Sequence, residues 1–215
     1  MSTLTIERKI LEKNDKIAQE LREEFKQNRI FVMNLMSAPG SGKTSIIENI
    51  THYFSGHLPT AVIAGDVQTD NDSRRIERSG IPVIQIVTNG ECHLEANLVR
   101  DAFRLLPVKD MRLLIIENVG NLICPAGFDL GESIKAVILS VTEGEDKPLK
   151  YPAMFRNASL LIINKIDLLP HLNCSIDEIR QNATTINPSL TIIETSCKTG
   201  EGIGDLCNWI QLQIK

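Results

Sequence analysis

Several features of membrane, secreted and nucleic-acid-binding proteins are missing from this 215-residue sequence. No uninterrupted apolar run approaches the ~18–20 residues that a membrane span requires, and the polar N-terminus has no apolar stretch typical of a signal peptide. Lys and Arg number 23 against 27 Asp and Glu, and the formal net charge of −4 argues against broad contact with a phosphate backbone. We therefore expect a soluble, cytoplasmic protein that binds neither membrane nor nucleic acid.

Cysteine is sparse and follows no regular framework. Five cysteines, an odd number, are typical of a reducing compartment, where a thiolate can be a metal ligand and a thiol can pack as a small hydrophobe. The chain has no internal repeat, no low-complexity tract and no Pro/Gly linker, and its 42% hydrophobic residues suffice for a sizeable core. We expect an N-terminal helical extension over residues 1–29 and one domain over residues 30–215.

Hydrophobic periodicity predicts strands that alternate with helices. Residues 4–28 place apolar side chains at helical spacing, which predicts a long amphipathic helix that serves packing or partner contact and takes no part in the chemistry. Apolar runs predict strands at residues 30–36, 61–64, 83–87, 113–116, 136–141, 160–163 and 190–193. Because these runs lack strict alternation, we predict an α/β three-layer sandwich with a mostly parallel sheet of about seven strands. Ligands gather at the carboxyl ends of such strands.

The first predicted strand leads into a phosphate-binding loop. Residues 37–44 read SAPGSGKT and fit the P-loop NTPase pattern, except that Ser37 stands where the common form has Gly. Lys43 would bridge the β- and γ-phosphates, and the Thr44 hydroxyl would coordinate Mg²⁺. A purely structural Gly-rich turn is the alternative, but the place of the loop between a strand and a helix argues against it. The predicted nucleotide-binding residues here are Gly40, Ser41, Gly42, Lys43, Thr44 and Ser45.

The base is indicated by residues 164–167, which read NKID directly after an apolar run. The Asp167 carboxylate can accept hydrogen bonds from N1–H and the exocyclic amine of guanine, a donor pair that adenine lacks, so we predict GTP. Asn164 can tie this loop to the phosphate loop, and Lys165 can lie along the base. The residues predicted to close over guanine O6 are Ser196, Cys197 and Lys198.

Carboxylates after two other strands predict the catalytic end of the site. Asp66 and Asp72 follow the second predicted strand, and Glu117 opens an ENVG run that resembles the Asp-x-x-Gly of GTPases, in which Gly120 would sense the γ-phosphate. The predicted catalytic residues are Lys43, Asp66, Asp72 and Glu117, and the predicted Mg²⁺ ligands are Thr44, Asp66 and Glu117. The alternative for such acids is loop solvation or helix capping, for which Asp70 is well placed. No glutamine or arginine finger is evident, so we expect slow intrinsic turnover.

Soft ligands form a separate group. Cys92 and His93 are adjacent, and Cys124 lies four residues after Gly120. Thiolate and imidazole are ligands for Zn²⁺ or Ni²⁺, but three ligands fall short of a closed tetrahedral site, which a second copy of the chain could complete. Spacing alone leaves a core or surface role open for these residues. We interpret the remaining cysteines as structural: Cys174, Cys197 and Cys207.

Several motifs together resemble the HypB family, GTPases that assist nickel insertion into [NiFe]-hydrogenase. They occupy residues 36–44, 65–72, 90–94, 117–125, 141–148 and 164–167. The Cys-His pair combined with the NVGNLICP run is specific to that family, and the resemblance extends from about residue 30 to the C-terminus. It implies a nickel or zinc site at Cys92, His93 and Cys124 and a GTP-dependent homodimer. It also implies hand-over through a HypA-type nickel chaperone to the hydrogenase large-subunit precursor.

One departure and two alternatives bear on this resemblance. Residues 1–29 contain neither Cys nor His, so the N-terminal nickel motif of some members is missing and nickel storage there is not expected. A urease accessory-type nickel GTPase shares the loop and the base signature, but it usually carries a Cys-Pro-His string that this chain lacks. A GTP-binding regulatory module without metal transfer would use Cys92 and Cys124 structurally. Ni²⁺ and Zn²⁺ accept the same donors, so both stay open.

Overall fold

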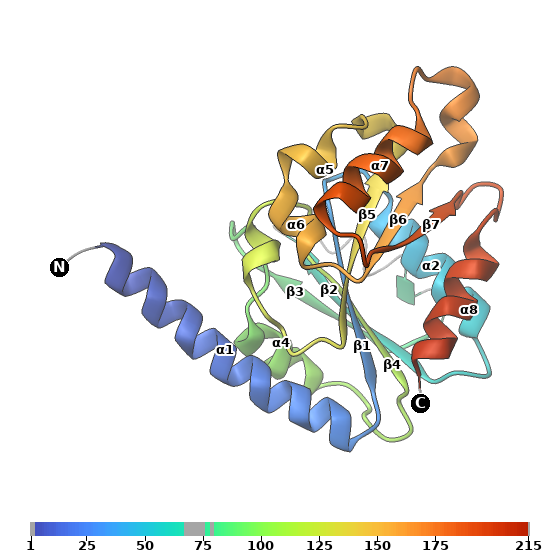
Figure 1. Cartoon of the computed structure of the whole chain (residues 1–215). Coiled ribbons are helices and arrows are strands. Elements are labelled where there is room, and N and C mark those ends of the chain that lie inside the picture. Colours follow the sequence, from blue (N-terminus) through green and yellow to red (C-terminus); the bar gives the residue numbers. More distant parts are fainter. Residues whose placement is uncertain (1–2, 67–75, 78–79, 215) are drawn as a thin grey trace.

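The computed structural model describes residues 3–66, 76–77 and 80–214, which form a seven-stranded sheet between two layers of helices (Figure 1). All strand pairs are parallel, in the order β3-β2-β4-β1-β5-β6-β7. The predicted α/β sandwich with an N-terminal helix is therefore confirmed. The strands are β1 (Phe31–Ser37), β2 (Thr60–Asp66), β3 (Val83–Val87), β4 (Leu113–Glu117), β5 (Ile134–Ser140), β6 (Leu160–Asn164) and β7 (Thr191–Thr195).

The helices divide between the two faces of the sheet (Figure 1). Helices α2 and α8 cover one face, whereas α1 and α4 cover the other face over β2 and β4, beside α6 and α7 over β5 and β6. Within the described part of the chain, none of the helices has the length and apolar character that crossing a membrane requires. The α-helices are α1 (Thr3–Gln27), α2 (Lys43–Phe54), α4 (Ala96–Phe103), α5 (Lys147–Lys150), α6 (Pro152–Arg156), α7 (Ile176–Ile186) and α8 (Ile203–Gln213), and the 3₁₀ turns are η1 (Cys124–Gly127), η2 (Val141–Glu143) and η3 (Ile166–His171).

Burial on both faces explains why the strands read as continuous apolar runs. In β4, Leu113 and Ile115 pack toward α2 and α8, whereas Leu114 and Ile116 pack toward α1 and α4. All four side chains are fully buried. Successive residues of a strand point to opposite faces, so β4, which is covered on both sides, carries apolar side chains at every position until Glu117 at the edge of the sheet.

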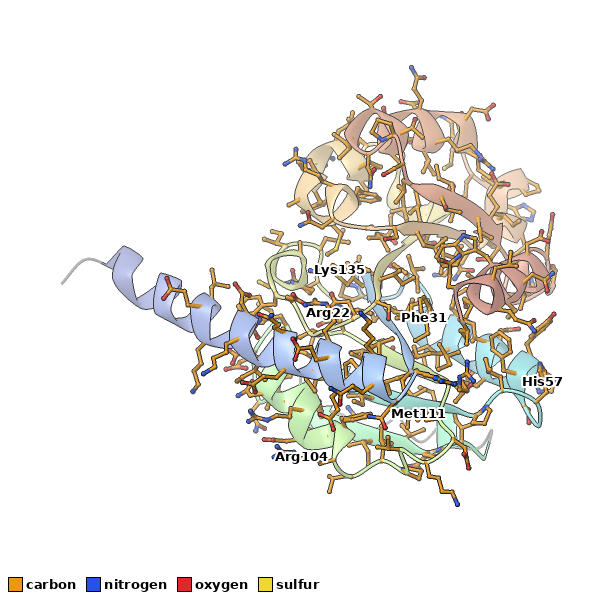
Figure 2. The ribbon with its side chains drawn as sticks, turned by 60° about the horizontal axis from the view of Figure 1, so that its bottom comes forward. Arg22, Phe31, His57, Arg104, Met111 and Lys135 are labelled. Atoms are coloured by element: carbon orange, nitrogen blue, oxygen red, sulfur yellow. The ribbon has the colours of Figure 1, made fainter. Side chains whose placement is uncertain are left out.

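Helix α1 packs on the sheet and on α4 (Figures 1 and 2). Its buried stripe includes Leu21 and Phe25, and the Phe25 ring meets the Phe103 ring of α4 edge to face, with centroids 4.9 Å apart. The amphipathic spacing in the sequence therefore marks a genuine packing face. The division into an extension over residues 1–29 and a domain over residues 30–215 stays a prediction, which the following substitution tests.

Phe25→Ala should lower the free energy of unfolding by about 3–5 kcal/mol, because it removes a buried ring and leaves a cavity between α1 and α4. Leu11→Ala is the matched control on the same helix, where the side chain is 37% exposed, and it should cost less than about 0.5 kcal/mol. Urea unfolding followed by circular dichroism measures both. A loss below about 1 kcal/mol for Phe25→Ala would mean that α1 contributes little to the stability of the domain.

Candidate functional site

The predicted motifs gather at one edge of the sheet, where the carboxyl ends of the parallel strands meet. Strand β4 lies between β1 and β2, and its last residue, Glu117, pairs with Leu35 of β1 and Ala64 of β2. The phosphate loop follows β1 directly, and Asp66 ends β2. Three segments that are far apart in the sequence therefore emerge side by side.

The phosphate loop between β1 and α2 has the backbone that its glycines allow. Gly40 and Gly42 have φ angles of +77° and +102°, and a Cβ at Gly42 would lie 2.5 Å from the side-chain nitrogen of Asn164. Ser37, the departure from the common pattern, is fully buried, and its hydroxyl accepts a hydrogen bond from Lys43 Nζ at 3.0 Å. Ser37 thereby holds Lys43 over the loop, which the usual Gly could not do through a side chain.

Hard oxygen ligands meet beside the loop. Thr44 Oγ1 donates a hydrogen bond to Glu117 Oε1 at 2.9 Å, and both side chains are buried. Asp66 lines the same cavity, together with Lys43. A hydroxyl and two carboxylates facing one cavity beside a phosphate loop are the donor set that Mg²⁺ prefers, so the residues present fit this ion.

Of the two other residues predicted at the catalytic end, the structure describes Gly120 but not Asp72. Gly120 lines the cavity, and a Cβ there would lie 3.2 Å from atoms of Pro39, so the segment after Glu117 packs directly against the phosphate loop. Asp72, together with Asp70 as the alternative helix cap, lies outside the described residues.

The loop predicted to read the base is tied to the phosphate loop. Asn164 Nδ2 donates to the carbonyl oxygen of Ser41 at 2.9 Å, and Lys165 Nζ donates to that of Gly40 at 2.6 Å. The bond from Asn164 is the kind of link expected for that residue, whereas the place of Lys165 along the base stays a prediction. Together the two bonds hold the phosphate loop against the loop that carries Asp167.

Asp167 lies in a second cavity, which Cys197 and Lys198 also line. Ser196 Oγ donates to Asp167 Oδ1 at 2.6 Å and so orients the carboxylate. Burial raises the pKa of Cys197 to about 11, so its thiol stays protonated and donates to Asn164 Oδ1 at 3.7 Å. The structure thus brings Ser196, Cys197 and Lys198 to the loop that carries Asp167.

Glu143 supports the phosphate loop, a role that the sequence analysis does not predict. Its Oε1 accepts hydrogen bonds from Ser41 Oγ at 2.7 Å and from the backbone N–H of Ser140 at 2.9 Å. Ser140 and Glu143 form a capping box around η2. The pattern Ser-x-x-Glu at the end of an apolar run is typical of a capping box and could have indicated this arrangement.

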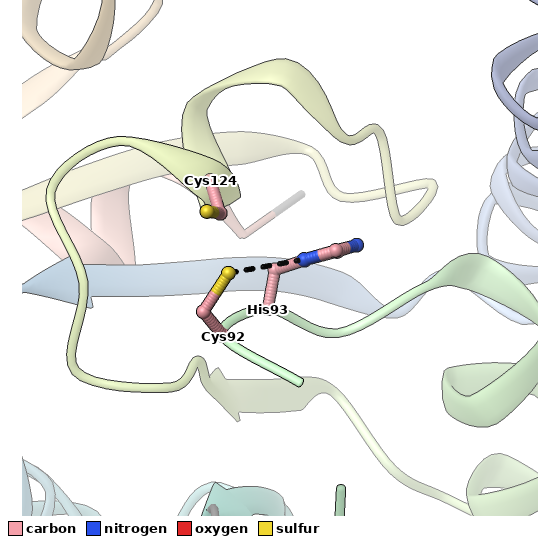
Figure 3. Close-up of side chains that lie close together, drawn as sticks. All are labelled: Cys92, His93 and Cys124. Carbon is pink, nitrogen blue, oxygen red and sulfur yellow. Dashed lines mark hydrogen bonds between the residues drawn. The ribbon is translucent and has the colours of Figure 1, made fainter. Parts of the chain in front are cut away.

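The soft ligands come together from two segments (Figure 3). The ligand atoms of Cys92, His93 and Cys124 all lie within 4.8 Å of one another, and Cys92 Sγ is 3.8 Å from His93 Nδ1. One ion with bonds of about 2.0–2.3 Å spans ligand atoms up to about 4.6 Å apart, so small side-chain rotations bring all three within reach of one ion. Two sulfurs and one imidazole nitrogen fit Ni²⁺ or Zn²⁺.

A stacked ring holds His93 in the cluster. Phe128, from the segment that carries Cys124, stacks on the imidazole with ring centroids 3.9 Å apart. His93 Nε2 is buried without a hydrogen-bond partner, whereas Nδ1 faces the Cys92 thiol. The nitrogen that faces the thiols, Nδ1, is therefore the one that could bind a metal ion held by the cluster. Phe128 was missed because a lone aromatic residue gives no pattern.

Cys124 is presented by a local turn. Asn121 Oδ1 accepts hydrogen bonds from the N–H groups of Ile123 at 2.7 Å and Cys124 at 3.0 Å. The hydrogen bond with Cys92 raises the pKa of the Cys124 thiol, and burial adds to the effect. A bound cation reverses this preference, because the thiolate is the form that ligates metal. Cys207, by contrast, lies in the core, where burial raises its pKa to about 12 and keeps the thiol inert.

Asn118 lies between the two centres and is fully buried. Its Oδ1 accepts hydrogen bonds from the N–H groups of Leu94 at 3.2 Å and Val119 at 2.9 Å. Leu94 follows His93 of the candidate metal cluster, and Val119 precedes Gly120 at the phosphate loop. A single amide therefore joins the segment behind the metal cluster to the segment that faces the nucleotide. The sequence offered no sign of this contact, which joins residues 24 positions apart.

Comparisons with known proteins assign the chain to a family. The family model described as CobW/HypB/UreG, nucleotide-binding domain, matches residues 31–194. The chain is 50% identical over 208 residues to hydrogenase maturation factor HypB of Azotobacter chroococcum mcd 1, an alignment that covers 97% of this chain and 68% of the relative. Against HypB of Escherichia coli K12 the identity is 48% over 210 residues, with 98% and 72% covered.

A solved structure is similar over nearly the whole chain. The crystal structure of HypB from Helicobacter pylori in complex with nickel superimposes with a TM-score of 0.89 at 38% sequence identity, and the match covers 94% of each chain. Sequence and fold thus point to the same group of proteins. The chain belongs to the HypB family of hydrogenase maturation factors, within the CobW/HypB/UreG nucleotide-binding domain family.

Proposed function

We propose that this chain is a GTP-hydrolysing metallochaperone that binds nickel and assists its insertion into [NiFe]-hydrogenase. The observation that carries the proposal is the placement of two centres at one edge of the sheet: a phosphate loop with a guanine-reading signature, and the cluster of Cys92, His93 and Cys124. The names of the relatives, hydrogenase maturation factor, support the client, and the nickel complex from Helicobacter pylori supports the metal. Zn²⁺ is the alternative ion, because it accepts the same donors.

The geometry of the nucleotide site supports slow hydrolysis of GTP. Lys43 would exchange its contact with Ser37 for phosphate oxygens, and the N–H groups of the loop and the first turn of α2 would surround the same oxygens. Thr44, Asp66 and Glu117 would hold Mg²⁺, which would supply neutralising charge when bound. The turnover is expected to be slow, because in this cavity the charge of the transition state would be met mainly by Lys43 and the ion.

A homodimer would complete the metal site. Three donors per chain leave a tetrahedral ion one ligand short, and Ile123, next to Cys124, is 69% exposed and can contribute apolar contact. An isologous interface would set two Cys124 thiolates near one axis. The function further requires a source of nickel, a HypA-type chaperone, and a recipient, the hydrogenase large-subunit precursor.

The dimer is expected to depend on GTP, because the segment from Gly120 to Cys124 begins at the phosphate loop and ends at the cluster. Sedimentation velocity should show a monomer with GDP and a dimer with a non-hydrolysable GTP analogue in the presence of Ni²⁺. A monomer with both nucleotides would contradict the shared site.

Asp167→Asn should weaken GTP binding about 100-fold and strengthen binding of xanthosine triphosphate, because an amide can donate where xanthine presents a carbonyl. Hydrolysis should follow the same change of base. Asp177→Asn, which changes an exposed residue of α7, is the matched control and should leave the affinity for both nucleotides unchanged. Unchanged GTP affinity in Asp167→Asn would show that another residue reads the base.

Lys43→Ala should abolish turnover of either nucleotide, because Lys43 is the residue expected to contact the transferred phosphate. A hydrolysis assay that follows phosphate release measures this loss, and turnover at the parent rate would contradict the role of Lys43.

Cys124→Ala should weaken nickel binding by more than about 100-fold, since even outer partners of metal ligands contribute about 10–100-fold. Cys174→Ala is the control, because that cysteine is partly exposed and is not in the cluster. Competition titration with a chromogenic chelator measures both variants. Equal losses, or none in Cys124→Ala, would remove this cluster as the metal site.

A further inference from the structure

Asn14 of α1 is a buried polar residue that touches two segments far from it in sequence. Its side chain is 4% exposed. Its Nδ2 donates to the carbonyl oxygen of Asp129 at 2.8 Å, and its Oδ1 accepts from the N–H of Ala96, also at 2.8 Å. One planar amide thus satisfies a partly buried acceptor on one segment and a buried donor on the other.

These two segments carry the metal cluster. Ala96 is the first residue of α4, three positions after His93, and the N-cap residue Glu95 makes no side-chain cap hydrogen bond. Asn14 therefore takes over one orphan donor of α4 from outside the helix. Asp129 directly follows Phe128, the ring that stacks on His93. The Asn14 amide joins the loop that bears Cys92 and His93 to the loop that bears Cys124.

Helix α1 is fixed firmly beside Asp129. Arg22 donates to both carboxylate oxygens of Asp129, at 2.7 Å for Oδ2. Burial alone would raise the pKa of Asp129, but the hydrogen bonds from Arg22 and from the N–H of Gly131 lower it. A Cβ at Gly131 would lie 2.7 Å from the carbonyl oxygen of Ala18, so the backbones are in close contact. Asn14 therefore acts from a rigid support.

The same two segments are also joined on their inner side. Asn118 accepts from the N–H of Leu94 and donates through Nδ2 to Asn34 Oδ1 at 3.2 Å. Asn34 in turn donates to Glu132 at 3.3 Å, whose other oxygen accepts from the N–H of Leu130 at 2.6 Å. The loop that bears Cys92 and His93 and the loop that bears Cys124 are thus joined twice, once through Asn14 and once through Asn118, Asn34 and Glu132. Removing one member leaves buried groups unsatisfied, which loosens the loops rather than rearranging them.

We propose that Asn14 is a positioning residue for the metal cluster, so that α1 sets the metal affinity although none of its residues is a ligand. This inference rests on the proposed binding of metal by Cys92, His93 and Cys124. It gives α1 a role beyond the packing expected from its periodicity. Position 14 requires an amide, because Asp supplies only the acceptor and Ala supplies neither group.

The test compares Asn14→Ala with two controls in the full-length chain. Asp15→Ala changes an exposed neighbour on the same helix, and Ile210→Ala lowers stability from α8 on the opposite face of the sheet. Ni²⁺ affinity should fall about tenfold in Asn14→Ala, which is the lower end of what outer partners of metal ligands contribute. It should stay unchanged in both controls. Asn14→Asp keeps the acceptor for Ala96 and should show a smaller loss, and it replaces Asn14→Ala if that variant does not fold.

A second probe reads the position of the thiols without nickel. A trivalent arsenical, which binds two neighbouring thiols, should be captured by Cys92 and Cys124 of the parent chain and the controls, and more weakly by Asn14→Ala. Parent-like capture of both probes by the Asn14 variants, or an equal loss in Ile210→Ala, would overturn the inference. If the parent chain captures the arsenical but not Ni²⁺, the proposed function fails, and the arsenical result alone decides the role of Asn14.

Discussion

The parallel pairing of β4 between β1 and β2 is the constraint on which the rest of the structure depends. It brings the phosphate loop, Asp66 and Glu117 to one edge, although they come from three separate parts of the sequence. A shift of one residue in this pairing would exchange the side chains that β4 presents to the two helix layers, so close packing of these side chains against both layers holds the register. Thr44 can contact Glu117 only because that register is fixed.

The same strand leads from one centre to the other. The chain leaves β4 at Glu117, passes Gly120 against the phosphate loop and reaches Cys124 at the cluster. Asn118 supplies a shorter connection through the N–H of Leu94. Packed elements with buried hydrogen bonds tend to switch between discrete arrangements rather than deform gradually, so a change at the γ-phosphate is expected to reach the thiols. By linkage, the metal must then influence nucleotide affinity to the same extent.

Local patterns in the sequence were sufficient where neighbouring residues carry the information. The apolar run at residues 160–163 predicted β6, and the NKID string after it placed Asp167 in a loop beside the phosphate cradle. The helical spacing of Leu21 and Phe25 likewise predicted the buried face of α1. Each of these features is carried by residues close together in the sequence, as an apolar run, a short motif or a helical period, so no knowledge of the partner element is needed.

The supporting residues could not be predicted, because their roles arise from contacts across the fold. Asn14 lies in a polar stretch of a helix, and nothing near it in the sequence indicates that Asp129, 115 positions away, accepts its hydrogen bond. Phe128 stacks on His93 only after two loops have come together. The three candidate metal ligands are predicted from their chemistry and from the family resemblance, but only the folded chain gives their separation. Hydrogen bonds between distant elements follow no sequence period, so neighbouring residues do not indicate them.

The central claim is that the nucleotide and the metal cluster are coupled. Its most direct test is the affinity of the protein for Ni²⁺, measured by competition once with GDP and once with a non-hydrolysable GTP analogue at the same Mg²⁺ concentration. Coupling of about 1–3 kcal/mol predicts affinities that differ about 5- to 150-fold between the two nucleotides. Equal affinities with both nucleotides would show that the two centres act independently, and the connection through Gly120 and Asn118 would then be structural only.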